Sequence, residues 1–275
     1  MAASVAALLA NAGIDAREAR LLLAAASGVA TALLAAFPER EIEAGAARRF
    51  AAMARRRAEG VPVAYILGRR EFYSREFAVT PDVLIPRPET ELLVELALQH
   101  IAPQAAGASA LDLGTGSGIV AITLACEAPH LRVTGVDASA AALAVARGNA
   151  QRLAPERNID FVLSDWFGAL GEARYDLIVG NPPYVAAGDE HLVQGDLRYE
   201  PPTALAAGPA GLDALAQIIT QAPRHLKPGA WLLLEHGYDQ GAACRQLLAA
   251  AGLQEARTWR DLAGIERVSG AKAHD

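Results

Sequence analysis

The chain has 275 residues, enough for one large domain or for a domain with a smaller companion, and 52% of them are hydrophobic, which can supply a buried core. A formal net charge of -6 and a pI near 5.6 give no general attraction to phosphate polymers, which disfavours nucleic acid as the main substrate. Cys126 and Cys244 lie far apart and the histidines show no metal-ligand spacing, so neither a disulfide scaffold nor a metal site is expected.

The N-terminal segment, residues 1 to about 60, is rich in Ala, Leu and Arg. Apolar residues such as Leu22 and Ala25 recur at helical spacing with essentially no strand signal, which predicts a small helical bundle. Met1–Ala10 is apolar but lacks a basic leader, and no apolar run reaches the ~18 residues that a membrane span needs. We expect Met1–Ala10 to be the first helix of a cytoplasmic protein without a membrane partner. The run Arg55–Arg57 is more typical of a solvated helix face than of a docking site.

A connecting segment follows. Residues 72–84 alternate and carry β-branched and aromatic side chains around a Thr-Pro-Asp turn, which predicts a β-hairpin or an extended connector. Pro88 suits the first turn of a helix that runs to His100. Arg87, Glu89 and Thr90 fit helix initiation as well as ligand contact, and their roles stay open. The predicted limits are a helical domain over 1–70, a hairpin connector over 71–86 and a larger domain over 87–275.

Beyond residue 108, short apolar runs alternate with helical patterns. Alternation at these lengths predicts an α/β fold with a doubly wound, mainly parallel sheet. The final stretch, Gln254–Lys272, could supply two antiparallel edge strands. The predicted strands are Ala108–Leu113, Leu131–Asp137, Ile159–Asp165, Tyr175–Gly180 and Ala230–Glu235, and the predicted helices are Ile119–Glu127, Ala138–Leu153, Leu212–Leu226 and Asp239–Ala251.

A glycine-rich turn joins the first of these strands to its helix. Asp112 precedes Gly114, Thr115, Gly116, Ser117 and Gly118, and the next strand ends at Asp137. Glycines let the backbone approach a ligand closely, a helix N-terminus presents free N–H groups, and an acid at the next strand end can accept hydrogen bonds from ribose hydroxyls. The turn therefore indicates a nucleotide-type site, but the loose dinucleotide pattern is also satisfied, so the loop alone does not exclude NAD.

A second motif follows the strand at Tyr175–Gly180: Asn181, Pro182, Pro183 and Tyr184. The Asn side-chain oxygen and backbone carbonyls of the rigid prolines can accept hydrogen bonds from both protons of a substrate NH2 group, and the tyrosine ring can stack on that flat group. In an open parallel sheet, ligands bind beyond the carboxyl ends of the strands. There we expect the glycine turn, Asp137, the pair Asp165 and Trp166, and Asn181–Tyr184 to converge.

These motifs carry a family resemblance. The chain resembles the release factor glutamine methyltransferases, the HemK/PrmC family, nearly end to end, and it departs from them at Ala207-Gly208, where the family tends to have two glycines. The glycine turn and the Asn-Pro-Pro-Tyr element are shared with other S-adenosylmethionine-dependent enzymes that methylate nitrogen, whereas other motifs are more specific to this family. The matching segments are Tyr65–Gly68, Glu71–Tyr73, Leu84–Glu91, Asp112–Gly118, Ser164–Phe167, Asn181–Tyr184 and Tyr199–Pro201 with Ala204 and Leu205.

The resemblance implies a Rossmann-like class I methyltransferase that moves a methyl group from S-adenosyl-L-methionine to the glutamine side-chain nitrogen in the Gly-Gly-Gln tripeptide of class I peptide chain release factors. It implies that Asn181, Pro182 and Tyr184 are catalytic and, with Pro183, hold the substrate amide. For the cofactor it implies backbone contacts from Gly114–Gly118, ribose contacts from Asp137, and adenine contacts from Asp165 and Trp166, with Asn181 beside the cofactor. The N-terminal domain is expected to help hold the release factor.

Three alternatives remain open at this point. A ribosomal-protein glutamine methyltransferase would share the cofactor loop and the amide-binding motif, but should differ in the segment Pro86–Glu91. A DNA adenine methyltransferase would need a basic recognition surface, which the acidic composition does not favour, so no DNA partner is expected. A non-catalytic cofactor-binding partner of the translation machinery would have no need of the acceptors in Asn181–Tyr184.

Overall fold

The computed structural model describes residues 3–101 and 107–275, and the start of the predicted first helix, Met1 and Ala2, lies outside them. The chain forms two compact units. The first takes in the chain to Arg69 together with Gln194–Tyr199, and the second contains Arg70–Val193 and Glu200–Asp275. Within the described ranges, no helix has the length and apolar character that crossing a membrane requires.

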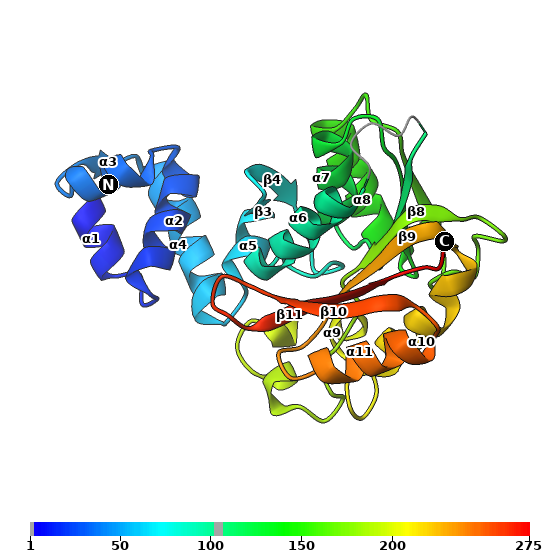
Figure 1. The fold of residues 1–275 in the computed structure, drawn as a ribbon. Coiled ribbons are helices and arrows are strands. Elements are labelled where there is room, and N and C mark those ends of the chain that lie inside the picture. Colours follow the sequence, from blue (N-terminus) through cyan, green and yellow to red (C-terminus); the bar gives the residue numbers. More distant parts are fainter. Residues whose placement is uncertain (1–2, 102–106) are drawn as a thin grey trace. The chain divides into compact units, whose positions relative to one another are not determined.

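The N-terminal unit is mainly helical (Figure 1). Its helices enclose a small apolar core that includes Leu22, Leu23 and Phe50. Asp15 caps the second helix, because its side chain accepts hydrogen bonds from the Arg17 and Glu18 N–H groups at 2.8 and 3.2 Å. The helices are α1 (Val5–Ala10), α2 (Ala16–Ser27), α3 (Thr31–Ala36), α4 (Ala44–Ala58) and α5 (Val63–Leu67).

Two short strands in this unit were not predicted. β1 (Ala3–Ser4) pairs with β2 (Glu41–Ile42) in antiparallel fashion, so α1 begins only at Val5. Strands of two residues are too short to show an alternating pattern in a sequence. The prediction that Arg55–Arg57 form a solvated helix face is wrong for Arg57. Its side chain is 20% exposed and forms ion pairs with Glu18 and Asp196.

A small two-stranded sheet begins the larger unit. It consists of β3 (Arg69–Phe72) and β4 (Arg75–Ala78), joined by Tyr73 and Ser74, both of which have positive φ. The Asn149 side chain holds β4, since Ala78 N–H donates to its oxygen and its amide donates to the Ala78 carbonyl. Phe72 and Phe77 from this sheet are buried in the main core.

The main sheet has seven strands in the order β10-β11-β9-β8-β5-β6-β7. The five strands from β9 to β7 are mutually parallel, whereas β11 is antiparallel to both β9 and β10. This confirms the doubly wound, mainly parallel α/β fold. The strands are β5 (Ser109–Leu113), β6 (Arg132–Asp137), β7 (Ile159–Leu163), β8 (Tyr175–Gly180), β9 (Leu226–Glu235), β10 (Gln254–Arg260) and β11 (Glu266–Lys272).

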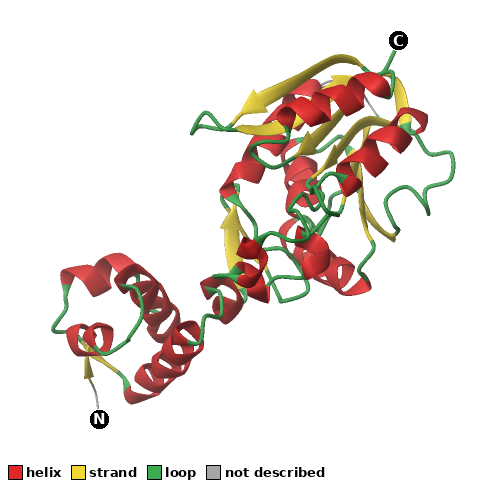
Figure 2. Cartoon of the chain, turned by 90° about the horizontal axis from the view of Figure 1, so that it is seen from below, coloured by secondary structure: helices red, strands yellow, loops and turns green. Residues whose placement is uncertain are grey.

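Helices cover both faces of this sheet (Figure 2). Successive strand residues alternate between two cores: Leu177 packs in the core that contains residues of α6 and α7, and Ile178 packs in the core that contains residues of α10 and α11. The helices are η1 (Pro88–Thr90), α6 (Glu91–His100), α7 (Ile119–Glu127), α8 (Ala140–Leu153), η2 (Glu190–Val193), η3 (Leu197–Tyr199), α9 (Pro202–Leu205), α10 (Asp213–Gln221), η4 (Ala222–Arg224) and α11 (Gly241–Ala250).

Two boundary predictions need correction. The helix predicted over 212–226 ends at Gln221 and passes into η4, because Pro223 cannot donate the N–H that a continuing α-helix requires. The strand predicted from Ala230 already begins at Leu226. Of the two antiparallel strands predicted near the C-terminus, only β10 lies at the sheet edge, since β11 is inserted between β10 and β9.

Candidate functional site

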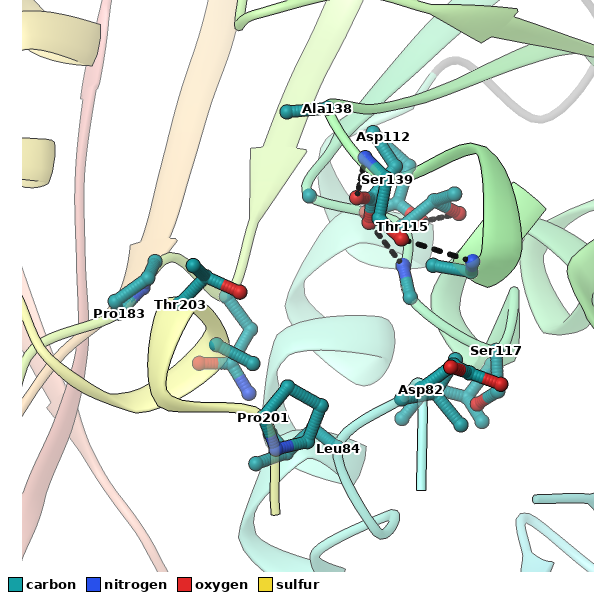
Figure 3. A pocket seen from close by; sticks show the side chains of 18 of the residues that line it. Asp82, Leu84, Asp112, Thr115, Ser117, Ala138, Ser139, Pro183, Pro201 and Thr203 are labelled. Atoms are coloured by element: carbon teal, nitrogen blue, oxygen red, sulfur yellow. Dashed lines mark hydrogen bonds between the residues drawn. The ribbon is translucent and has the colours of Figure 1, made fainter. Parts of the chain in front are cut away.

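A cavity of about 590 Å³ lies at the carboxyl ends of the parallel strands, within the larger unit (Figure 3). Its walls come from the loops that follow β5, β6, β7 and β8, together with residues 81–84, Pro86, Arg87, Thr90 and residues 201–204. A volume of this size is typical of small-molecule sites, and its position is where open parallel sheets bind ligands. Nearly all the predicted site residues line it; Gly118, Pro182 and Tyr184 do not.

The glycine turn after β5 forms one wall. Gly114, Gly116 and Gly118 have φ values of +69°, +53° and +83°, which side chains rarely tolerate. A Cβ on Gly118 would approach Ile122 Cδ1 to 2.8 Å, so this glycine lets α7 pack closely rather than lining the cavity. A Cβ on Gly116 would meet no other atom closer than 4.0 Å, which leaves the space beside this backbone open to a ligand.

Asp112 organises this turn from beneath. Its carboxylate accepts hydrogen bonds from Thr115 Oγ1 at 2.7 Å and from the Ala121 N–H at 3.1 Å, which ties the start of the turn to α7. Burial raises the pKa of Asp112 to about 6, against the lowering effect of these two hydrogen bonds. In the sequence, Asp112 is part of the motif, but the motif alone gives it no role.

Asp137 closes the other side of the turn. Its two carboxylate oxygens accept hydrogen bonds from the N–H groups of Gly116 and Ser139, both at 2.9 Å. Ser139 in turn caps α8 by accepting from the Ala142 N–H. A carboxylate can accept about four hydrogen bonds, so Asp137 keeps capacity for a ligand on the cavity side.

Asp165 and Trp166 follow β7 and both line the cavity. Trp166 has a φ of +45°, an unusual conformation for an aromatic residue, which turns its ring beside Gly114. The Ser164 hydroxyl stabilises this turn, because it donates to the Trp166 carbonyl at 2.8 Å and accepts from the Ala169 N–H at 3.0 Å. The result is a flat apolar surface next to a carboxylate.

Asn181 leaves the end of β8 and reaches the cavity. Its Nδ2 donates to Thr90 Oγ1 at 3.2 Å. Among the described residues, no group donates to Asn181 Oδ1 or to the Pro182 carbonyl, so both oxygens keep their capacity to accept. Pro183 lines the cavity beside Asn181.

The Tyr184 ring packs instead against the core that contains residues of α10 and α11. Its carbonyl accepts a hydrogen bond from Gln240 Nε2 at 2.9 Å, which holds the chain after the prolines. Burial raises the pKa of the Tyr184 phenol, so the ring stays neutral at physiological pH. The expected stacking of this ring on a substrate group stays a prediction.

Three further groups near the site had no assigned role in the sequence analysis. Glu200 is buried and accepts from the Ile85 N–H at 3.0 Å while pairing with Arg87, which fixes the wall segment before η1. Thr90, 1% exposed, lines the cavity, and Glu235 ends β9 with a buried carboxylate. The signal for Glu235 in the sequence is an acid directly after the apolar run of residues 230–234.

Comparison with known proteins identifies the family. The chain matches the PrmC N-terminal domain over residues 2–68 and the methyltransferase small domain over residues 89–198. It is 51% identical to a release factor glutamine methyltransferase of Bordetella pertussis, covering 96% of this chain and 97% of that protein. It is 52% identical to one of Pseudomonas aeruginosa, covering 92% and 90%. The chain belongs to the release factor glutamine methyltransferase family.

Solved structures agree on the fold. A methyltransferase of Pyrococcus furiosus matches with a TM-score of 0.54 and 17% identity, over 74% of this chain and 91% of that one. The Thermus thermophilus 16S rRNA methyltransferase RsmC, solved with AdoMet and guanosine, matches with a TM-score of 0.54 and 23% identity, over 75% and 50%. Membership of the release factor glutamine methyltransferase family and the match to the methyltransferase small domain make this protein an S-adenosylmethionine-dependent methyltransferase.

The residues of the cavity fit that cofactor. The open space beside Gly116 suits a ligand that lies against backbone, and the N–H groups at the start of α7 suit a carboxylate group. Asp137 offers acceptors to hydroxyl groups, and Trp166 offers an apolar face to a planar base. No group of three or more His, Cys, Asp or Glu side chains in the described part of the chain could hold a metal ion.

Proposed function

We propose that this protein methylates the side-chain amide nitrogen of the glutamine in the Gly-Gly-Gln tripeptide of class I peptide chain release factors. The observation that carries the proposal is Asn181 at the edge of the cavity, with its nitrogen bonded to Thr90 and its oxygen without a donor among the described residues. The names of the relatives at about half identity support the same substrate. A substrate that works in translation would place the enzyme in the cytoplasm.

The chemical difficulty lies in the amide. Its nitrogen is a poor nucleophile because the lone pair is delocalised into the carbonyl. In our proposal, Asn181 Oδ1 and the Pro182 carbonyl each accept one hydrogen from the glutamine NH2 group, which orients the nitrogen and stabilises the positive charge that develops on it. The proton can leave after methyl transfer, so no strong base is required.

The cofactor wall has a different task. S-adenosylmethionine supplies an electrophilic methyl group on a sulfonium centre. We propose that the backbone of Gly114–Gly118, with Thr115 and Ser117, holds the methionyl end, that Asp137 accepts hydrogen bonds from the ribose, and that Asp165 and Trp166 hold the adenine. The closed arrangement of the turn supports this assignment, because Asp112 already accepts from the Thr115 hydroxyl and Asp137 from the Gly116 N–H.

Two finer assignments complete the proposal. Pro183 and Tyr184 keep the acceptor segment rigid, which the bond from Gln240 to the Tyr184 carbonyl supports. Residues 1–70 form the domain that helps bind the release factor, 71–86 form the connector and 87–275 form the methyltransferase domain, with partners limited to release factors.

The proposal is tested with labelled S-adenosylmethionine and a purified class I release factor. We expect one methyl group on the tripeptide glutamine, located by mass spectrometry of the peptide, and no label on a release factor in which that glutamine is replaced by glutamate. Ribosomal protein and DNA serve as competing acceptors in parallel reactions. Label that appears only on one of those acceptors would overturn the substrate assignment.

A further inference from the structure

A buried carboxylate lies directly behind the acceptor segment. Glu235 is the last residue of β9 and is 1% exposed. β8 and β9 are parallel, with Gly180 opposite Leu234, so Asn181, the first residue after β8, lies beside Glu235, which still belongs to β9. The segment that holds the substrate amide and this carboxylate are therefore neighbours by strand register.

Few groups compensate this charge. Hydrogen bonds from the side chains of Thr90 and Asn181 lower the pKa of Glu235, but the dominant effect is burial, which raises it to about 7. Oε2 has no hydrogen-bond partner in the described part of the chain. Arg267, the nearby cation, forms its ion pair with Asp261 at 3.1 Å, and Glu89 adds a second negative charge.

Stability does not account for such a group. A buried carboxylate with an unpartnered oxygen costs free energy, and a hydrophobic residue of similar size would serve the core better. The ionised carboxylate of Glu235 can only accept hydrogen bonds, whereas an Asn carboxamide can donate at one end and accept at the other. Next to Glu235, the end of Asn181 that turns toward the carboxylate has to be the NH2 group.

We propose that Glu235, acting with Thr90, is a positioning residue that fixes the orientation of the Asn181 carboxamide, so that Nδ2 turns toward these two side chains and Oδ1 turns toward the substrate amide. The inference rests on the proposed function of Asn181 and adds to it. The Thr90 hydroxyl accepts from Asn181 Nδ2 at 3.2 Å, and in our proposal its own hydrogen points toward the carboxylate, whose pKa it lowers. The flipped carboxamide would present an NH2 group to the substrate NH2 group, and two donors repel.

The arrangement depends on the charge of Glu235. The groups that face it are Thr90 and Glu89 from η1, Asn181 and Tyr184 after β8, and Arg267 from β11; the neighbouring His236 bonds to the Ser269 hydroxyl and the Gly237 carbonyl. When Glu235 is protonated it can itself donate a hydrogen bond. Thr90 and Asn181 then no longer have to turn their donors toward it. Activity is therefore present above a pH of about 7 and falls as pH decreases through that value.

Matched substitutions test the proposal. Glu235→Gln keeps the shape and adds a donor, and Thr90→Val keeps the shape and removes the hydroxyl. We expect each to lower kcat about 10- to 100-fold, because a misaligned acceptor no longer positions the amide. The affinity for S-adenosylmethionine, measured by calorimetry, should change less than about twofold, and the melting temperature should not fall for Glu235→Gln because no buried charge remains. Thr90→Ser, which keeps the hydroxyl, should restore most of the kcat that Thr90→Val loses.

Asp176→Asn is the control. Asp176 lies near the other end of β8, where its carboxylate bonds Lys227 and Ser109, so its loss perturbs the same strand without touching the acceptor segment.

The pH dependence of activity distinguishes a positioning role of Glu235 from a merely structural one. The wild-type kcat/KM should fall about tenfold per pH unit below the Glu235 pKa, and the Glu235→Gln profile should be flat over that range.

A second measurement does not need the substrate. The Asn181 side-chain NH2 resonances, assigned by their loss in Asn181→Ala, should shift with a midpoint near pH 7 in wild type and stay constant in Glu235→Gln. The proposal is overturned if these resonances do not titrate, if Glu235→Gln and Thr90→Val keep kcat within twofold of wild type, or if kcat, cofactor affinity and stability fall together. Failure of the wild type to methylate any release factor would overturn the proposed function alone, since the resonances still test the orientation.

Discussion

The two sides of the cavity are built in different ways. On the cofactor side, the bonds that shape the turn join residues close in sequence: Thr115 to Asp112 across three positions and Gly116 to Asp137 across 21. On the substrate side, the Asn181 side chain donates a hydrogen bond to Thr90, 91 positions away. The glycine turn is thus shaped mainly by residues of its own βαβ segment, whereas the orientation of Asn181 depends on how distant elements pack.

This difference has a functional consequence. A turn made of backbone N–H groups and glycines with positive φ has its ligand-binding groups fixed by its own backbone. A wall made of one carboxamide that can turn over needs neighbours to choose its orientation. We therefore expect substitutions on the two sides to separate cofactor affinity from turnover.

The largest expected effect is on the substrate side. Asn181→Ala should lower kcat roughly 10²- to 10³-fold, because it removes an acceptor aimed at charge that develops in the transition state. The affinity for S-adenosylmethionine, measured by calorimetry, should stay within a few-fold of wild type. Asn158→Ala, at an exposed position, is the control and should leave both quantities unchanged. Equal losses of turnover and cofactor affinity in Asn181→Ala would mean that the two walls are not separable.

On the cofactor side we expect a smaller effect, which falls on cofactor affinity and not on turnover. Gly116→Ala places a methyl group in the open space beside the turn, at a φ of +53°, and should weaken S-adenosylmethionine binding about tenfold through strain and steric exclusion. Gly252→Ala is the matched control, since its φ is +78° with no atom within 4 Å and it does not line the cavity. Both variants should lose about 1 kcal/mol of folding stability in denaturant titrations.

Only the Gly116→Ala enzyme should need more cofactor, and its kcat at saturating cofactor should remain close to wild type. A kcat loss in Gly116→Ala that excess S-adenosylmethionine does not restore would show that this turn also positions the substrate. The two sides of the cavity would then not act separately on cofactor affinity and turnover.

The same contrast explains what the sequence could predict. The strands and the glycine turn follow from apolar runs and local motifs, and the predicted α7 and β8 match the structure at both ends. Local composition could not place β11 between β9 and β10, because strand order is decided by packing. It likewise gave no partner for Asn181, since Thr90 and Glu235 approach it only after the sheet has formed.

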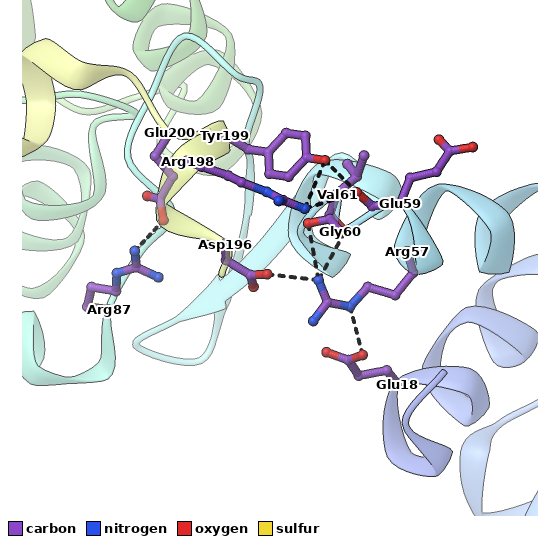
Figure 4. A network of polar contacts seen from close by, with 10 residues as sticks. All are labelled: Glu18, Arg57, Glu59, Gly60, Val61, Arg87, Asp196, Arg198, Tyr199 and Glu200. Carbon is purple, nitrogen blue, oxygen red and sulfur yellow. Dashed lines mark hydrogen bonds and ion pairs between the residues drawn. The ribbon is translucent and has the colours of Figure 1, made fainter. Parts of the chain in front are cut away.

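The N-terminal unit gives a further case of long-range support. Gln194–Tyr199, from the loop after the acceptor segment, belongs to this unit (Figure 4). Arg57 bonds Asp196 at 2.8 Å and Glu18 at 2.7 Å, and the Tyr199 hydroxyl donates to the Glu59 carbonyl at 2.7 Å. Gly60 has a φ of +97°, which other residues rarely adopt, and a Cβ there would displace the end of the Arg198 side chain.

The smallest expected effect comes from this contact. Arg57→Ala leaves Asp196 and Glu18 without their common cation and should loosen Gln194–Tyr199. Because the ion pairs are partly exposed, we expect only about a two- to fivefold rise in the KM for release factor, with cofactor affinity unchanged. The exposed neighbour provides the control: Arg56→Ala removes the same charge and should have no effect. If both variants raise KM equally, the net positive charge of α4, rather than the hold on the loop, governs binding of the protein substrate.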